Sequence, residues 1–428
     1  MQALKRLSLL RRFSIAASPQ LQSTKNTVSQ SPTQPANVDW EEHEEKLEDY
    51  DPAINGYCPV VPGDVLGSYR IFRKLGWGVY STVWLAESQG SPDLFALKLM
   101  TRVATEAQGQ LHELEFLQRI RDQSPLHPGH AHVIQMKDNF YHQGPHGRHL
   151  CVVTEPLFQS MSNFLPRFPH KIMPPRLVRS VARQIVLGLQ YLHDECNIIH
   201  TDIKPDNVLM VAPNSQNFFR DNHSGLGNPP ETFVARSPLG GTITRTRSDP
   251  LLSPIPESVS LDDDIWNHLK VKITDLGIAC WANKVSQHFT EIIQSPPLRA
   301  PEVAIGAGWG TPADIWSLGC TTYELYMGQA LIPEDVDELL VPPLHVSLFG
   351  QYPEELLKRG KHRHVFYDVN GSLKVTIPEK PFYADISKRN APDAELFTDF
   401  LRRTFALNPD QRATCRELLE HPWLNLEK

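Results

Sequence analysis

The sequence has 428 residues, with 42 lysines and arginines against 49 aspartates and glutamates, so its formal net charge is −7. This length suits one large domain or two lobes with tails, and 40% hydrophobic with 21% charged residues is typical of a globular protein. The negative charge argues against a protein that coats nucleic acid. No apolar run approaches the roughly 18 residues of a membrane-spanning helix. We therefore expect neither direct nucleic-acid binding nor membrane contact.

The first 63 residues are predicted to be a disordered tail. Residues 1–38 contain basic residues, serines and glutamines but no acidic residue, whereas residues 39–51 contain eight acidic residues and one basic residue. The basic part favours a disordered terminus, and a mitochondrial presequence within residues 1–30 is the alternative. The acidic part is typical of a solvated segment.

Two lobes follow the tail. Short β-rich runs and one helical pattern indicate a small, mostly β lobe over residues 64–157. Residues 158–424 indicate a larger, mainly helical lobe, because Val178, Val181, Ile185 and Leu189 recur at helical spacing and further helices are expected over 312–327 and 394–405. A stretch at 211–268 rich in Pro, Ser, Gly and Asn predicts a disordered insert.

The six cysteines lie far apart, without a Cys-x-x-Cys pair. This spacing predicts reduced, buried thiols and neither a disulfide framework nor a zinc site.

A glycine-rich loop, Leu75–Val83, lies between two predicted strands. Glycines at 76 and 78 allow the backbone to approach phosphate oxygens and to donate N–H groups to them. Taken alone, this pattern also fits an ordinary hairpin turn. No helix follows at once, which argues against a Rossmann dinucleotide site.

Lys98 ends the next predicted strand, in Phe95-Ala-Leu-Lys98. A lysine in an apolar strand is costly unless its charge is paired. Glu113 on the following helix is the expected partner, which leaves the ammonium to hold the α- and β-phosphates of a nucleotide. An exposed strand lysine is the alternative.

The segment His200-Thr-Asp-Ile-Lys-Pro-Asp-Asn207 places polar residues between two apolar runs. Phosphoryl transfer to a hydroxyl needs a carboxylate to accept the proton, a cation near the transferred phosphate and an oxygen ligand for magnesium. Asp202, Lys204 and Asn207 supply these three groups within one loop.

Asp275 follows a short apolar strand and precedes Leu276-Gly277, and its carboxylate suits the magnesium ion that bridges the phosphates. Further along, Ala300-Pro301-Glu302 closes the loop that begins at Asp275. Arg412 is predicted to pair with Glu302, as a structural support.

In this order, these segments resemble the protein-kinase signature set over residues 64–424. Three runs resemble more narrowly the SR-protein kinases, which phosphorylate serines in Arg-Ser repeats of splicing factors. They are Leu75-Gly-Trp-Gly-Val-Tyr-Ser-Thr-Val-Trp84, His200-Thr-Asp-Ile-Lys-Pro-Asp-Asn207 and Thr274-Asp-Leu-Gly-Ile-Ala-Cys-Trp281.

The resemblance implies an α+β, two-lobed kinase fold and a serine/threonine kinase that uses ATP and Mg²⁺. It also implies a role for each matching position. Asp202 would be the catalytic base, Lys204 and Lys98 would contact phosphates, and Glu113 would pair with Lys98. The nucleotide would contact Leu75, Gly76, Gly78, Ser81, Val83, Ala96, Lys98 and Glu155, and the metal would bind to Asn207 and Asp275.

Arg/Ser-rich splicing proteins are the expected substrates, so that the enzyme would regulate mRNA processing. Glu334, Asp335, Asp337 and Glu338 are candidates for an acidic docking groove, and a solvated acidic loop is the alternative. Two other functions remain open, a kinase for other basic or proline-directed substrates and a non-catalytic ATP-binding scaffold. A monomer in the cytoplasm and nucleus is expected from the family.

Overall fold

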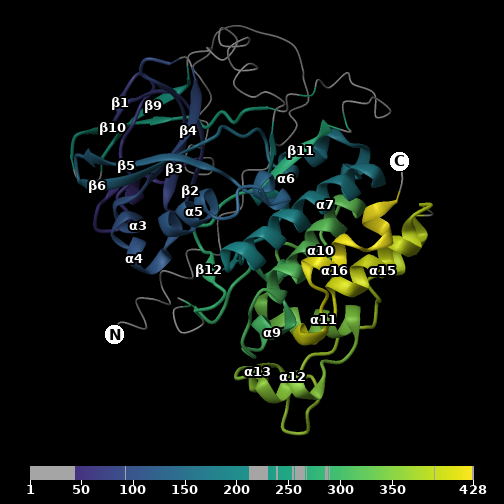
Figure 1. The fold of residues 1–428 in the computed structure, drawn as a ribbon. Coiled ribbons are helices and arrows are strands. Elements are labelled where there is room, and N and C mark those ends of the chain that lie inside the picture. Colours follow the sequence, from purple (N-terminus) through teal and green to yellow (C-terminus); the bar gives the residue numbers. More distant parts are fainter. Residues whose placement is uncertain are drawn as a thin grey trace, which may run out of the picture. The chain divides into compact units, whose positions relative to one another are not determined.

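The computed structural model describes residues 44–91, 93–211, 230–237, 240–252, 255, 266, 268–284, 288, 290–389 and 391–426. Within these ranges the chain forms two compact units (Figure 1). The first unit contains the described residues up to Ala107, Lys137–Pro156, and those between 216 and 251. The second contains Gln108–Met136, the described residues of Leu157–Ser215, and those from Leu252 onward.

A six-stranded sheet forms the first unit. In spatial order its strands are β1 (Val65–Leu66), β2 (Tyr69–Gly78), β3 (Ser81–Ser88), β4 (Leu94–Met100), β6 (Gly147–Thr154) and β5 (Met136–Gly144). One face carries the core, in which Trp84, Leu97 and Val153 are almost fully buried. Because side chains alternate along a strand, the other face of β4 presents Ala96 and Lys98. The short helix α3 (Arg102–Glu106) follows, with its first turn capped by the Thr101 hydroxyl.

Helices dominate the second unit. They are α4 (Gln108–Leu111), α5 (Glu113–Asp122), α6 (Met161–Phe164), α7 (Pro175–Gln190), α9 (Pro301–Ala304), α10 (Pro312–Met327), α11 (Val341–Phe349), α12 (Glu354–Arg359), α13 (Arg363–Phe366), α14 (Ala384–Lys388), α15 (Ala394–Thr404) and α16 (Cys415–Leu419). Two small antiparallel pairs accompany them, β8 (Val208–Val211) with β11 (Lys270–Ile273) and β7 (Ile198–Ile199) with β12 (Cys280–Trp281).

Helix α7 lies at the centre of this unit and packs against α10, α16 and β11. Val178, Val181, Ile185 and Leu189 are all buried, so the helical spacing expected from the sequence is confirmed. Gly188 allows the close approach of α7 to β11. A Cβ atom there would lie 2.9 Å from the Ile273 side chain and 3.0 Å from the His132 carbonyl oxygen. Helices α10 and α15 also match the ranges expected from the sequence.

Three features differ from the sequence-based expectations. From Glu44 onward the expected tail is folded, with Glu44 and Glu45 only 2% and 1% exposed; residues 1–43 lie outside the described ranges. The expected disordered insert contains the antiparallel strands β9 (Thr232–Arg236) and β10 (Thr242–Thr246), which belong to the first unit. Helix α5, expected in the small lobe, belongs to the second unit. Composition could not reveal these features, because they depend on contacts between distant segments.

All six cysteines are free and buried, as expected. In the described part of the chain, no helix combines the length and apolar character needed to cross a membrane.

Candidate active site

The glycine-rich loop forms the turn between β2 and β3. Gly76 lies opposite Val83 and Gly78 lies opposite Ser81, and a register irregularity between Lys74 and Gly76 falls at Leu75. Neither glycine has a positive φ, so the backbone conformation does not demand glycine. A Cβ atom at either position would meet no protein atom within 4 Å. These glycines therefore leave the loop's backbone uncovered on a side that no described protein atom fills.

The face of β4 that presents Ala96 and Lys98 lies beside this loop. Lys98 is opposite Val83 on β3 and Val152 on β6, while Ala96 is opposite Thr154. Val83, Ala96 and Lys98 therefore lie on one face of the sheet, because directly opposed residues and residues two apart share a face. Glu155 follows the last residue of β6. This face combines small apolar side chains with one half-buried ammonium group.

Glu113 is the first residue of α5 and is 5% exposed. It lies in the second unit, whereas Lys98 lies in the first. The expected pairing of Glu113 with Lys98 therefore stays a prediction.

Asp202, Lys204 and Asn207 come together in the second unit, as the sequence predicted. Lys204 Nζ lies 2.8 Å from Asp202 Oδ2, and Asn207 Nδ2 donates to the same oxygen at 3.0 Å and to the Asp202 carbonyl at 2.9 Å. Burial alone would lower the pKa of Lys204, but the charges of Asp202, Asp206 and Asp275 raise it above its ordinary value. The lysine is therefore a permanent cation beside an aligned carboxylate.

Asp275 reaches the same loop through β11. Strand β11 pairs with β8, which begins directly after Asn207, and the Thr274 N–H group donates to the Asn207 carbonyl at 2.9 Å. Asp275 has a φ of +61°, in the left-handed region that is uncommon for residues other than glycine. This turn follows directly after Thr274, the residue that is bonded to Asn207, so the two candidate metal ligands are one residue removed from a shared backbone contact.

A residue outside the predicted site, Asp314, holds the backbone of this loop. Asp314, at the start of α10, is fully buried. Its carboxylate accepts the backbone N–H groups of His200 and Thr201, each at 2.8 Å, and His193 Nε2 at 2.8 Å. In the sequence, Asp314 falls in the first turn of the helix expected over 312–327, where acidic residues are common. The chain distance of more than 110 residues leaves no local signal for these contacts.

Thr201 and His200 add two further constraints on Asp202. Thr201 has a φ of +72°, a strained value for a β-branched residue, and its hydroxyl donates to the Ile278 carbonyl at 2.8 Å. His200 Nε2 lies 2.8 Å from the Thr274 carbonyl oxygen, so Nε2 carries the proton and Nδ1 accepts the Asp202 N–H group at 3.2 Å. These contacts hold the backbone of His200, Thr201 and Asp202 in one conformation.

The predicted pairing of Glu302 with Arg412 is confirmed. Arg412 forms a bidentate pair with Glu302, at 2.7 and 2.9 Å, and both side chains are fully buried. Gln294 connects the neighbouring segments, because its amide donates to the Ala313 carbonyl and accepts the Ala300 N–H group.

Comparisons with known proteins agree with this geometry. Residues 69–219 and 263–424 match the family model for the protein kinase domain. A solved kinase domain aligns with a TM-score of 0.61 at 21% identity, covering 86% of this chain and 98% of that domain, which supports the fold.

Among curated relatives, the serine/threonine-protein kinase SRPK of Physarum polycephalum is 35% identical over 408 residues, which cover 90% of this chain and 92% of the relative. The protein kinase dsk1 of Schizosaccharomyces pombe is 29% identical, covering 89% and 85%. SRSF protein kinase 3 of Homo sapiens is 28% identical, covering 90% and 91%. The chain therefore belongs to the protein kinase family, as a serine/threonine kinase of the SRPK group.

Proposed function

We propose that this kinase transfers the γ-phosphoryl group of ATP to serine and threonine hydroxyls in Arg/Ser-rich proteins, with Asp202 as the catalytic base. The observation that carries the proposal is the Asp202 carboxylate, held by Lys204 at 2.8 Å and by Asn207 at 3.0 Å. The bond between the Thr274 N–H group and the Asn207 carbonyl supports the assignment of Asp275, the next residue, to the same site. These are the groups that phosphoryl transfer requires.

ATP fits the first unit for three reasons. The open space at Gly76 and Gly78 leaves backbone N–H groups for phosphate oxygens, and Ser81 lies opposite Gly78. Lys98 supplies a positive charge on the same sheet. Val83 and Ala96 present a small apolar surface, with Leu75 at the loop's start, which suits a flat adenine ring. We assign to Glu155, at the end of β6, the backbone that hydrogen-bonds adenine.

A magnesium ion fits the oxygen donors of Asp275 and Asn207. Magnesium prefers hard oxygen ligands and typically takes one or two from protein and others from phosphate and water. Asn207 donates through Nδ2 to Asp202, which leaves its Oδ1 as the coordinating atom. When bound, the ion would neutralise charge on the phosphates.

The remaining chemistry belongs to the catalytic loop, His200–Asn207. Asp202 orients the substrate hydroxyl and accepts its proton as the oxygen–phosphorus bond forms and the bond to ADP breaks. Lys204 stabilises negative charge on the transferred phosphoryl group. Asp314 is a positioning residue, because it fixes the backbone N–H groups immediately before Asp202. Most of the rate therefore comes from placement and charge.

The substrate class rests on acidic side chains in the second unit and on the names of two relatives. SRPK and SRSF protein kinase 3 are similar to this chain over nine tenths of its length. Glu334 and Asp335 are exposed, whereas Asp337 caps a short helical turn and Glu338 lies 3.6 Å from Arg299. Burial, together with the charges of Asp206 and Glu334, raises the pKa of Glu324 to about 7. Glu324 therefore carries a full negative charge only above about pH 7.

A peptide comparison tests the substrate class. We expect the highest kcat/KM for an Arg-Ser repeat, a lower value for a Lys-Ser repeat and the lowest for a Ser-Pro peptide, because arginine binds carboxylates in a bidentate geometry. Equal kcat/KM for all three peptides would retain the kinase and reject Arg-Ser preference. A higher value for Ser-Pro would favour a proline-directed kinase.

Glu324 gives this preference a pH dependence. Because its pKa is about 7, the carboxyl group is neutral below that pH and charged above it. A basic peptide binds better to the charged form, so its KM should fall as the pH rises through about 7. We expect Glu324→Gln to remove this change while the KM for ATP follows the wild-type profile. A wild-type pH profile in the Glu324→Gln variant would contradict the assignment.

Thr201 predicts activity without phosphorylation of the activation segment. An arginine at this position can pair with a phosphorylated residue, but a threonine cannot form that ion pair. Here the Thr201 hydroxyl instead donates to the Ile278 carbonyl. Phosphatase-treated enzyme, checked by mass spectrometry, should therefore retain its turnover of peptide. Loss of turnover that returns on rephosphorylation would refute this prediction.

We also propose that the enzyme acts as a monomer in the cytoplasm and nucleus and binds no nucleic acid directly. A fluorescent fusion with and without residues 1–30 tests the compartment. Mitochondrial signal that requires those residues would support the presequence alternative instead.

A further inference from the structure

The residues before the sheet form an N-terminal strap, Glu44–Tyr57, that contacts the glycine-rich loop. Tyr57 Oη donates to the Gly78 carbonyl at 2.5 Å, and Asn55 Nδ2 donates to the Val79 carbonyl. Both side chains belong to the buried interior, at 2% and 4% exposure. Burial, with the charges of Glu45 and Asp49, raises the pKa of Tyr57, so its hydroxyl remains a donor.

These bonds determine where the loop's N–H groups point. In a trans peptide unit the carbonyl and the following N–H point in opposite directions. With the carbonyls of Gly78 and Val79 held on the strap side, the N–H groups of Val79 and Tyr80 are directed to the opposite side. The next carbonyl, of Tyr80, accepts the Thr101 N–H group at 2.8 Å. Three consecutive carbonyls are therefore held by the protein.

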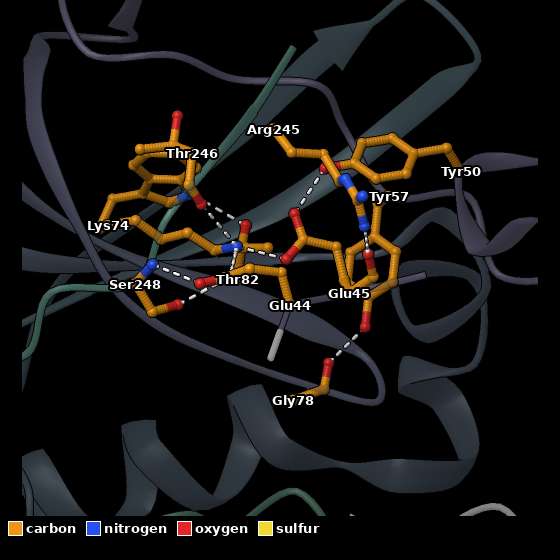
Figure 2. A network of polar contacts seen from close by, with 11 residues as sticks. Glu44, Glu45, Tyr50, Tyr57, Lys74, Gly78, Thr82, Arg245, Thr246 and Ser248 are labelled. Carbon is orange, nitrogen blue, oxygen red and sulfur yellow. Dashed lines mark hydrogen bonds and ion pairs between the residues drawn. The ribbon is translucent and has the colours of Figure 1, made fainter. Parts of the chain in front are cut away.

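The strap is itself tied to α3 and to a buried charge cluster. Its Gly56 carbonyl accepts the Arg102 N–H group at 2.9 Å. Lys74 on β2, fully buried, forms ion pairs with Glu44 at 2.6 Å and with Glu45 (Figure 2). Glu45 also accepts the Tyr50 hydroxyl at 2.6 Å. Two carboxylates and one ammonium group carry a formal net charge of −1, so a second cation nearby would stabilise the cluster.

The β9–β10 hairpin adds a buried guanidinium group beside this cluster. Arg245, 1% exposed, donates to the Glu45 carbonyl at 2.9 Å, and the Thr246 carbonyl accepts Lys74 at 3.2 Å. The Ser248 hydroxyl donates to Glu44 at 2.9 Å. Figure 2 shows these side chains converging from the strap, from β2 and from the hairpin. Removing one ion of such a cluster leaves an uncompensated buried charge, so the arrangement holds the strap firmly.

We propose that Tyr57 and Asn55 are positioning residues for ATP, which hold the glycine-rich loop so that its backbone N–H groups face the phosphates. The inference rests on the proposed function, in which this loop covers the phosphates. The strap acts through the loop and touches no substrate. The insert hairpin, through Arg245 and Ser248, keeps the strap in place. The strap before the sheet and the hairpin far beyond it in sequence would thus share a role in nucleotide binding.

Tyr57→Phe tests this role with the smallest change, since it removes the hydroxyl and keeps the ring. The bond lost is a single buried hydrogen bond, so we expect the KM for ATP to rise about three- to tenfold while kcat and the KM for peptide stay near wild type. Asn55→Ala should act in the same direction. The matched control is Tyr69→Phe, whose hydroxyl contacts Asp138 on the same sheet and not the loop.

A binding measurement separates positioning from general damage. We expect Tyr57→Phe to weaken binding of ATP with Mg²⁺ by the same factor and to leave adenosine binding unchanged, because the strap bonds the loop at Gly78 and Val79, which face the phosphates, and not at the positions assigned to adenine. Equal losses for ATP and adenosine, or none for either, would overturn the proposal. The outcome is distinguishable from failure of the proposed function. In that case the wild-type enzyme would transfer no phosphate, whatever the variants bind.

Discussion

Asp202→Asn should lower kcat by about 10²–10⁴-fold with little change in the KM for ATP. The amide occupies nearly the same space and can still accept a hydrogen bond from Lys204, but it cannot take the proton from the substrate hydroxyl. In the wild-type enzyme this carboxylate lies 2.8 Å from Lys204 Nζ and 3.0 Å from Asn207 Nδ2. The measurement is steady-state transfer to peptide.

A second variant separates chemistry from nucleotide binding. Lys98→Met removes the charge assigned to the phosphates, so it should also weaken ATP binding. Both variants should remain folded, because asparagine keeps a hydrogen-bond acceptor for Lys204 and methionine keeps an apolar stem close in length to that of Lys98. Thermal unfolding checks this. Wild-type kcat in Asp202→Asn would refute the assignment of the base.

Glu302→Ala should destabilise the second unit by about 3–5 kcal/mol. Glu302 and Arg412 are both fully buried and joined by two hydrogen bonds, so the truncation leaves the guanidinium without its counter-ion. Arg412 would keep its bonds to the Pro312 and Ala406 carbonyls, which neutralise no charge. Urea unfolding followed by tryptophan fluorescence measures the loss.

The exposed pair of Arg359 and Asp410 is the control. These groups are 3.6 Å apart, with side chains 44% and 72% exposed, so Asp410→Ala should cost less than about 1 kcal/mol. Replacing both buried partners, as Glu302→Leu with Arg412→Met, should recover part of the lost stability. If Glu302→Ala matched Asp410→Ala, the buried pair would contribute nothing beyond a surface pair.

The second unit's site was predictable because its chemistry is local in sequence. Asp202, Lys204 and Asn207 share one short loop, so their spacing along the chain nearly fixes their spacing in space. The buried pair of Glu302 and Arg412 was also predicted, although 110 positions separate its members. Asp314 shows the limit. An aspartate in the first turn of a helix is common in any sequence, and only the fold places this one against the His200 and Thr201 N–H groups.

The first unit was harder to predict because its contacts are long-range. An acidic run normally indicates solvation, yet Glu44 and Glu45 are buried against Lys74, a residue about 30 positions away. The hairpin partner Arg245 lies 200 positions from Glu45. The glycines of the loop were expected to let the backbone approach phosphate oxygens. The structure agrees with open space at both positions, and their ordinary φ values show that the missing side chain, not an unusual backbone conformation, is what matters.

The most direct test of the account is phosphate transfer from γ-labelled ATP, with Mg²⁺, to an Arg-Ser repeat peptide. The comparison uses the wild-type enzyme, the Asp202→Asn variant and an Arg-Ala peptide that lacks the hydroxyl. We predict label on serine only when the wild-type enzyme meets the Arg-Ser repeat. ATP binding without transfer by the wild-type enzyme, or equal transfer by Asp202→Asn, would contradict it.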